Sequence, residues 1–229
     1  MEPRKININT QPDFAQNPGE LFDVVHADGT PTGRTKPRAA VHHDGDWHRA
    51  LHLWVAGIAE NGQPFLMFQQ RSPAKDTWPG RFDATVGGHF GAGETLADAF
   101  REVHEEIGIH PDPEAITTLG VRICANESER GVLDREVQDV LLLRDDRPLT
   151  AYHPNPAEVA ALVRFPLPAL LDFLVEESER IEGETMPAGE SPRHTAVQRG
   201  QFVPNVDRYF YRVAIAATAV LRGDRHVAV

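Results

Sequence analysis

The chain has 229 residues, a formal net charge of -11 and a hydrophobic fraction of 41%. This length fits one large domain or one and a half, and the hydrophobic fraction is ordinary for a globular core. The acidic balance excludes a broad basic surface, so we expect no nucleic-acid partner. Cys124 is the single cysteine, so no intrachain disulfide can form, which fits a reducing cytoplasm.

The sequence shows no targeting or membrane-spanning segment. Its first residues contain no apolar signal core. The longest apolar run, 213–221, is interrupted by Thr218 and is too short to span a bilayer. We therefore expect a cytoplasmic protein with no membrane partner.

Apolar periodicity and turn signals predict the elements. Residues 1–19 are polar with scattered prolines and predict a loose N-terminal arm. The expected strands are 21–25, 52–59, 64–71, 82–86, 116–125, 136–143 and 158–165, although the alanines of the last would also suit a helix. The expected helices are 95–109, 167–177 and 206–221, and 183–192 is expected to be a loop. Strands with interspersed helices indicate an α/β sandwich.

A glycine-rich loop at 87–94 runs into a segment that carries three glutamates. Glu102, Glu105 and Glu106 stand at i, i+3 and i+4, so they share one helical face and repel one another. A bound divalent cation would turn this repulsion into attraction, and carboxylate oxygens suit Mg²⁺ or Mn²⁺. A merely solvated acidic face would look the same. The adjoining glycines, which let the backbone approach an ion closely, favour the metal site.

The stretch 88–109 resembles the Nudix box of the Nudix hydrolases. That box reads Gly, five residues, Glu, seven residues, then Arg-Glu-aliphatic-any-Glu-Glu-any-Gly-aliphatic. The chain matches Gly88, Glu94 and every position from Arg101 to Ile109. Only six residues separate Glu94 from Arg101, which rotates Glu94 by roughly 100° relative to the later glutamates. The usual pairing of Glu94 with Arg101 is therefore an open question, whereas the register of the metal face is kept.

The resemblance implies the Nudix α/β/α sandwich with a mixed sheet over residues 20–180. The C-terminal extension 181–229 would place an accessory helix on that domain. The implied activity is Mg²⁺-dependent (or Mn²⁺-dependent) cleavage of a diphosphate linkage in a small nucleoside or organic diphosphate derivative. A homodimer is also compatible with the family.

The resemblance also implies the roles of the box residues. The metal ligands would be Glu102, Glu105, Glu106 and the Gly87 carbonyl. The ion would neutralise developing charge and lower the pKa of a bound water. The general base would be Glu105 or Glu136, and the sequence leaves this choice open. Arg101 is expected to be structural and to pair with nearby acids.

Eleven histidines form a second unusual feature. His42, His43, His48 and His52 are close in sequence, and His89 lies in the glycine loop. Neutral imidazole binds transition metals, which favours a metal or phosphate site. Histidines without a role would give the same pattern.

The runs 46–54 and 70–80 are similar to isopentenyl-diphosphate isomerase, a Nudix-fold relative, and the similarity extends roughly from Gly29 to Phe165. It implies diphosphate contacts by Arg71 and Lys75, although both could be plain surface charges. It also implies a second metal site, whose members would be His43, His48, His89 and Glu136, with Asp134 as the other acidic ligand.

One departure separates the chain from the isomerases. Their catalytic cysteine stands two residues before the loop histidine, where this chain has Gly87. Cys124 lies far away in sequence, whereas the box glutamates are complete. The chain therefore resembles a hydrolase on an isomerase-like scaffold. An isomerase and a non-catalytic diphosphate sensor remain the alternatives.

Overall fold

The structure is a computed structural model that describes residues 17–127 and 131–229. Most of the expected N-terminal arm, residues 1–16, lies outside the described residues. The strands are β1 (Leu21–Val25), β2 (Pro31–Pro37), β3 (Trp47–Ile58), β4 (Pro64–Arg71), β5 (Phe82–Asp83), β6 (Val86–His89), β7 (Ile116–Glu127), β8 (Leu133–Arg144), β9 (Val159–Pro166), β10 (Arg180–Pro187) and β11 (Arg193–Gln198). The helices are α1 (Arg38–Asp44), α2 (Leu96–Ala99), α3 (Arg101–Ile107), α4 (Leu167–Leu174) and α5 (Tyr209–Leu221). Within the described residues no helix is long and apolar enough to cross a bilayer.

These strands join in one mixed sheet, whose main path runs β11-β10-β9-β4-β3-β1-β2. The long strand β3 is its centre, because it pairs antiparallel with β4 and β6 and parallel with β8. β7 pairs with β8, and β5 pairs with β4. Strands so far apart in sequence therefore meet at β3, and the candidate residues they carry are brought together.

The central strand β3 is apolar along most of its length because both of its faces are covered. Successive side chains point to opposite faces. Leu51, Leu53 and Val55 belong to one core, whereas Trp54 and Ala56 belong to the other. The first core includes Val103 and Ile107 of α3, and the second includes side chains of α4 and α5.

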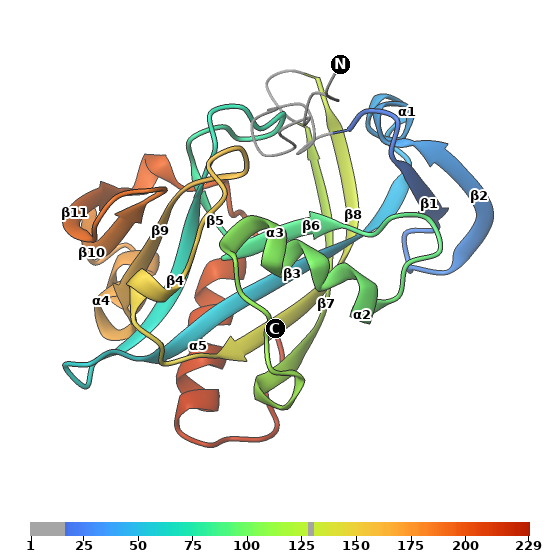
Figure 1. The fold of residues 1–229 in the computed structure, drawn as a ribbon. Coiled ribbons are helices and arrows are strands. Elements are labelled where there is room, and N and C mark those ends of the chain that lie inside the picture. Colours follow the sequence, from blue (N-terminus) through green and yellow to red (C-terminus); the bar gives the residue numbers. More distant parts are fainter. Residues whose placement is uncertain (1–16, 128–130) are drawn as a thin grey trace, which may run out of the picture.

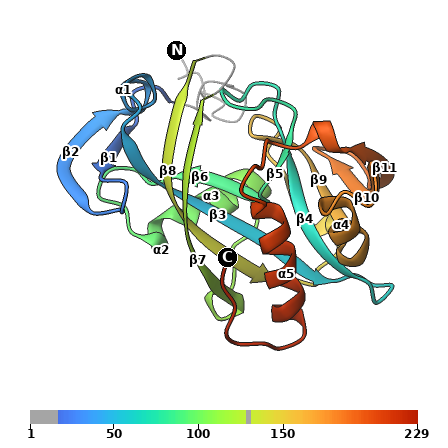
Figure 2. The ribbon, with the colours of Figure 1, turned by 180° about the vertical axis from the view of Figure 1, so that it is seen from behind.

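The layers are visible in two opposite views. Figure 1 shows α2 and α3 in front of β3 and β6, and Figure 2 shows α5 crossing the other face of the sheet. On that face Tyr209 and Phe210 pack against Trp54, with ring centroids 5.8 and 5.6 Å away. The expected α/β/α sandwich with a C-terminal helix is confirmed.

Three local expectations need correction. The expected loop at 183–192 is wrong for 183–187, because β10 continues the sheet beside β9, and only 188–192 form the turn into β11. Gly87 and Gly88 lie in β6 rather than in a loop, because they pair with β3, opposite His52 and Leu51. The segment 95–109 is divided at Phe100 into α2 and α3. The predicted domain boundary at 180 stays a prediction, and the sheet continues across it.

Candidate active site

A cavity of about 290 Å³ lies where α3, β6 and β8 meet the beginning of α5. One end is lined by the α3 glutamates, which we call the glutamate end. Another is lined by His42, His89 and Asp134, which we call the histidine end. His52 and Tyr209 line the wall between the sheet and α5. Residues predicted from two separate sequence patterns thus face one space.

The pairing of Glu94 with Arg101, which the sequence left open, is present. The Arg101 Nε donates to Glu94 Oε1 at 2.9 Å, and the Gly91 N–H donates to Glu94 Oε2 at 2.7 Å. Thr95 caps α2, so Glu94 stands before the helix begins. The family pattern has one more residue between Glu94 and Arg101 than this chain. The loop before α2 and the break between α2 and α3 nevertheless let Glu94 reach Arg101.

Arg101 is the common partner of the other acids at this end, as expected for a structural residue. It donates to Glu102 Oε1 at 2.6 Å and to Glu105 Oε2 at 3.3 Å. Its Nη2 lies 3.6 Å from Glu20 Oε1. Glu105 has a side chain that is 55% exposed, so it is the most accessible of the three α3 glutamates.

Glu102 is packed closely against β6. A Cβ atom on Gly88 would lie 2.4 Å from Glu102 Cγ, so only glycine allows this approach. Burial and the charge of Glu106 together raise the pKa of Glu102 to about 8, against the opposing effect of Arg101. A bound cation would offset this unfavourable charge.

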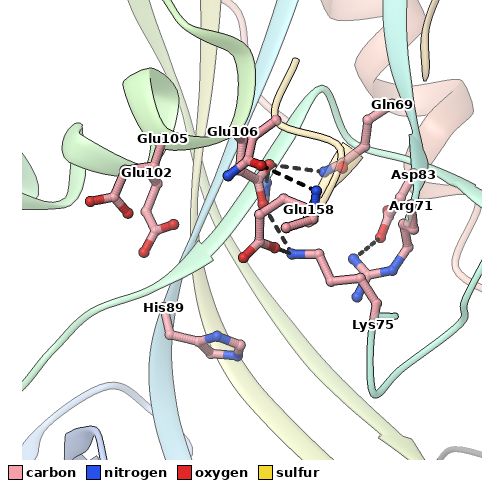
Figure 3. Close-up of polar contacts among 12 residues, drawn as sticks. Gln69, Arg71, Lys75, Asp83, His89, Glu102, Glu105, Glu106 and Glu158 are labelled. Carbon is pink, nitrogen blue, oxygen red and sulfur yellow. Dashed lines mark hydrogen bonds and ion pairs between the residues drawn. The ribbon is translucent and has the colours of Figure 1, made fainter. Parts of the chain in front are cut away.

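Glu106 is almost fully buried and is held by three donors (Figure 3). Its Oε2 accepts from Gln69 Nε2 at 3.1 Å and from the Gly87 N–H at 3.3 Å. Its Oε1 accepts from Lys75 Nζ at 3.2 Å. Burial raises the pKa of Glu106, and Lys75 acts in the opposite direction. Glu106 is therefore turned toward Lys75, whereas Figure 3 shows Glu102 and Glu105 to its left, further from Lys75.

The cations expected to bind diphosphate are both held by the chain itself. Lys75 forms a second ion pair, with Glu158. Arg71 donates through Nε to the Thr77 carbonyl at 2.9 Å and through Nη1 to Asp83 Oδ2 at 3.3 Å. Both side chains line the cavity. They are thus built into the site rather than being plain surface charges.

Sequence reasoning missed Gln69 and Glu158. Gln69 interrupts the apolar run of β4, and a fully buried amide at such a position is a signal for a polar partner across the sheet. Glu158 directly precedes β9, which pairs with β4. No local pattern predicts that this glutamate meets Lys75, because the contact depends on strand pairing.

The histidine end is a compact cluster of His42 from α1, His48 from β3, His89 from β6 and Asp134 from β8. Each offers one ligand atom, and these atoms lie within 4.8 Å of one another. Asp134 Oδ1 lies 3.6 Å from His48 Nε2 and 3.9 Å from His42 Nε2. In the described parts of the chain, these two nitrogens and Asp134 Oδ1 have no hydrogen-bond partner, whereas His89 Nε2 faces Glu136.

The buried rings are neutral, as metal binding requires. Burial lowers the pKa of His42 to about 3 and also lowers the pKa values of His48 and His89. The His48 Nδ1–H donates to the Asp46 carbonyl at 3.1 Å, which leaves Nε2 free as a ligand. Three imidazoles and a carboxylate suit Zn²⁺, Mn²⁺ or Co²⁺ better than Mg²⁺.

The structure does not bring His43 into this cluster. Its side chain is 87% exposed and lies 2.8 Å from Asp44 Oδ1. Neighbouring residues of a helix point about 100° apart, so His42 faces inward when His43 faces solvent. Glu136, the other expected ligand, lies beside the cluster, with Oε1 3.1 Å from His89 Nε2.

Cys124 does not line the cavity. It is buried on β7, and Asn126 Nδ2 donates to its sulfur at 3.1 Å. Burial raises the pKa of the thiol to about 12, despite the opposing charge of Arg122. The thiol is therefore protonated near neutral pH, which does not suit a catalytic nucleophile or base.

The fold is shared with solved structures. A crystal structure from Deinococcus radiodurans superposes with a TM-score of 0.52 over 75% of this chain and 93% of that one, at 22% identity. At this identity the likeness concerns the fold alone.

The sequence comparisons define the family. Residues 48–189 match the NUDIX domain. The chain is 30% identical to a Nudix hydrolase of Clostridium acetobutylicum over 203 residues. These residues are 86% of this chain and 96% of that protein. The chain belongs to the Nudix hydrolase family.

Two further relatives match smaller shares of this chain. Nudix hydrolase 3 of Arabidopsis thaliana is 37% identical over 163 residues, which are 69% of this chain but only 21% of the plant protein. The chain thus matches about a fifth of that relative. Isopentenyl-diphosphate Delta-isomerase of Paenarthrobacter aurescens is 32% identical over 145 residues, covering 63% of this chain and 74% of the isomerase.

Proposed function

We propose that the protein is a divalent-metal-dependent hydrolase that cleaves a diphosphate linkage in a small nucleoside or organic diphosphate derivative. The observation that carries this proposal is the set of three α3 glutamates at one cavity, beside two built-in cations. A bound Mg²⁺ or Mn²⁺ would neutralise charge on the diphosphate and lower the pKa of a water molecule.

The glutamate end fits such an ion. Glu102, Glu105 and Glu106 would hold it, with the Gly87 carbonyl as a further oxygen ligand. When Glu106 becomes a ligand, Lys75 would keep its pair with Glu158 and turn its remaining donors toward a phosphate oxygen. Arg71, fixed by Asp83 and Thr77, would bind a second phosphate oxygen.

The accessible carboxylate of Glu105 favours it as the general base. Within the described residues its side chain accepts one hydrogen bond, from Arg101 at 3.3 Å. Glu136, the other candidate, is buried and is engaged by Gln138 and His89. A proton taken from water at Glu105 can leave directly to solvent.

We also propose that the histidine end holds a transition-metal ion through His42, His48, His89 and Asp134, with Glu136 beside it. The support is the set of converging buried ligand atoms that lack hydrogen bonds. His42 replaces His43 in the ligand set that the sequence predicted.

An isomerase acting on isopentenyl diphosphate is the second candidate, favoured by the histidine cluster and by the similarity to isomerases. Isomerisation requires a proton donor and acceptor on opposite faces of the alkene. Gly87 occupies the position of the isomerase thiol, and Cys124 does not line the cavity. These observations favour hydrolysis.

The cytoplasmic location and a homodimer stay predictions.

The test is a parallel screen of nucleoside diphosphates, sugar diphosphates and isoprenoid diphosphates, with Mg²⁺ and with EDTA. Phosphate or phosphomonoester release that needs Mg²⁺ is the expected result. Dimethylallyl diphosphate formed from isopentenyl diphosphate would instead support the isomerase. Binding of a diphosphate without turnover of any compound would support a sensor.

A further inference from the structure

A chain of buried hydrogen bonds connects the histidine end with the C-terminal helix. Gln138 Nε2 donates to Glu136, and Gln138 Oε1 accepts from Arg122 Nη1 at 2.9 Å. The same Gln138 nitrogen lies 3.2 Å from His52 Nε2. His52 Nδ1 lies 3.2 Å from the Tyr209 hydroxyl. The chain thus crosses from β8 through β3 to α5.

The directions of these bonds follow from the donors. A guanidinium only donates, so Arg122 fixes the Gln138 oxygen and the amide nitrogen faces His52. That nitrogen also only donates, so His52 Nε2 must accept. Burial lowers the pKa of His52, consistent with a neutral ring. The single proton of the ring is therefore on Nδ1, and it is donated to the oxygen of Tyr209.

The Tyr209 oxygen receives a second donor on its other side. Trp54 Nε1, which can only donate, lies 2.8 Å from it. Both lone pairs of the hydroxyl oxygen are then used. The hydroxyl hydrogen has no acceptor within residues 17–127 and 131–229, and Tyr209 lines the cavity. A buried donor without an acceptor is unfavourable, whereas a ligand in the cavity would supply one.

Accepting two hydrogen bonds strengthens the hydroxyl as a donor. The surrounding wall carries the polar side chains of Asn126, Asn205 and Gln138 beside the apolar Val203 and Phe210. The Arg122 guanidinium stacks over the Tyr209 ring, 4.1 Å from its centroid, and holds the ring in place. A purely hydrocarbon group at this wall would leave the Tyr209 hydroxyl hydrogen without an acceptor.

We propose that Tyr209 donates a hydrogen bond to an oxygen or nitrogen atom in the organic half of the substrate. This contact makes the site select diphosphates with a polar organic half over prenyl diphosphates. The inference rests on the proposed diphosphate hydrolysis. The contributing helix begins at residue 209, beyond the matched 48–189 segment, so this specificity is a property of the C-terminal extension.

The test compares the wild type with Tyr209→Phe and with the matched control Tyr211→Phe, which lies on the same helix but does not line this cavity. The measurement is kcat/KM for the best substrate among nucleoside diphosphates and nucleotide sugars, divided by kcat/KM for isopentenyl diphosphate. If isopentenyl diphosphate is not turned over, its inhibition constant divided by the KM of the polar substrate is used instead. This selectivity is unaffected by a partly unfolded preparation, because both values come from one sample.

We expect the wild type to prefer the polar substrate, and Tyr209→Phe to reduce the selectivity roughly 3–10-fold, as for loss of one neutral hydrogen bond. Tyr211→Phe should leave it unchanged. A wild type that prefers isopentenyl diphosphate, or a selectivity unchanged in Tyr209→Phe, overturns this inference and leaves metal-dependent hydrolysis standing. Absence of metal-dependent hydrolysis across the whole panel overturns the proposed function and this inference with it.

Discussion

The two ends of the cavity handle buried polar groups in opposite ways. At the glutamate end the chain supplies its own cations, Lys75 beside Glu106 and Arg101 beside Glu102 and Glu105. At the histidine end the ligand atoms of His42, His48 and Asp134 lack hydrogen-bond partners in the described residues. The first end is partly compensated without a metal, so its ion should exchange more easily than an ion at the histidine end. The second needs an ion to satisfy it, so binding should be tight.

The largest expected effect is at the glutamate end. Glu106→Gln keeps the size of the side chain but removes a metal ligand and one of the two carboxylates around Lys75. We expect turnover to fall on the order of 10²–10³-fold with the fold intact. Glu105→Gln should behave similarly. Steady-state rates in Mg²⁺ are the measurement, with exposed Glu182→Gln on β10 as the control. Near-normal Mg²⁺-dependent turnover in both variants would contradict the metal role of α3.

Two neighbouring glycines offer a matched pair. A Cβ at Gly88 would lie 2.4 Å from Glu102 Cγ, whereas a Cβ at Gly87 would have its nearest neighbour, the His52 ring, at 3.8 Å. Gly88→Ala should displace Glu102 and reduce kcat about 10²-fold, as misplaced ligands do. Gly87→Ala should retain most activity, because its carbonyl is kept. Equal rates for the two variants would show that the position of Glu102 is unimportant.

The histidine end is tested by adjacent residues of one helix. His42→Ala should lose one equivalent of tightly bound Zn²⁺ or Mn²⁺, whereas His43→Ala should retain it. Metal content after loading and desalting is the measurement. Binding of Mg²⁺ at the glutamate end should be unaffected in both. Equal metal content in the wild type and His42→Ala would assign the cluster to packing alone.

A smaller effect concerns pH. The pKa of Glu102 is raised in the folded protein to about 8, so in the metal-free state the folded form binds more protons than the unfolded form between about pH 4.5 and 8. The contribution of Glu102 to stability therefore falls as pH rises through this window, by at most a few kcal/mol. Urea unfolding in EDTA should show wild type losing stability relative to Glu102→Gln from pH 5 to 8. Parallel curves would contradict the raised pKa.

The smallest effect is expected at Cys124. Cys124→Ser should leave hydrolysis nearly unchanged, because the thiol does not line the cavity. The thiol of the wild type should also resist alkylation at pH 8 until the protein unfolds, since its pKa is raised to about 12. Complete loss of activity in folded Cys124→Ser would favour the thiol-dependent isomerase over the hydrolase.

Local patterns predicted the parts of the site that lie within one element. The register of Glu102, Glu105 and Glu106 depends only on helical spacing, and it is kept in α3. The strand 64–71 was also predicted correctly as β4, because its apolar run lies between clear turns. The expected loop at 183–192 failed over 183–187 because β10 is held by its pairing with β9, and its own sequence, with Glu, Gly and Thr, indicates a strand only weakly.

The rest depends on contacts between distant segments. The choice between His42 and His43 requires knowing which side of α1 faces β3. The partners Glu158 and Gln69 meet α3 only after β9 and β4 have paired. Tyr209 meets His52 across 157 residues. No spacing rule includes such separations, so the ligand pocket became visible only in the folded chain.

The central strand β3 sets the size of the whole site. His48 at the ion cluster and His52 at the Tyr209 wall are four residues apart on this strand, so their side chains face the same way about 13 Å apart. β3 is paired on both edges and covered on both faces, so this spacing cannot change without disrupting the middle of the sheet. The strand therefore holds the two histidines at a fixed separation. A ligand that touches both histidine regions must have a fixed length, and only the walls formed by loops can adjust to its width.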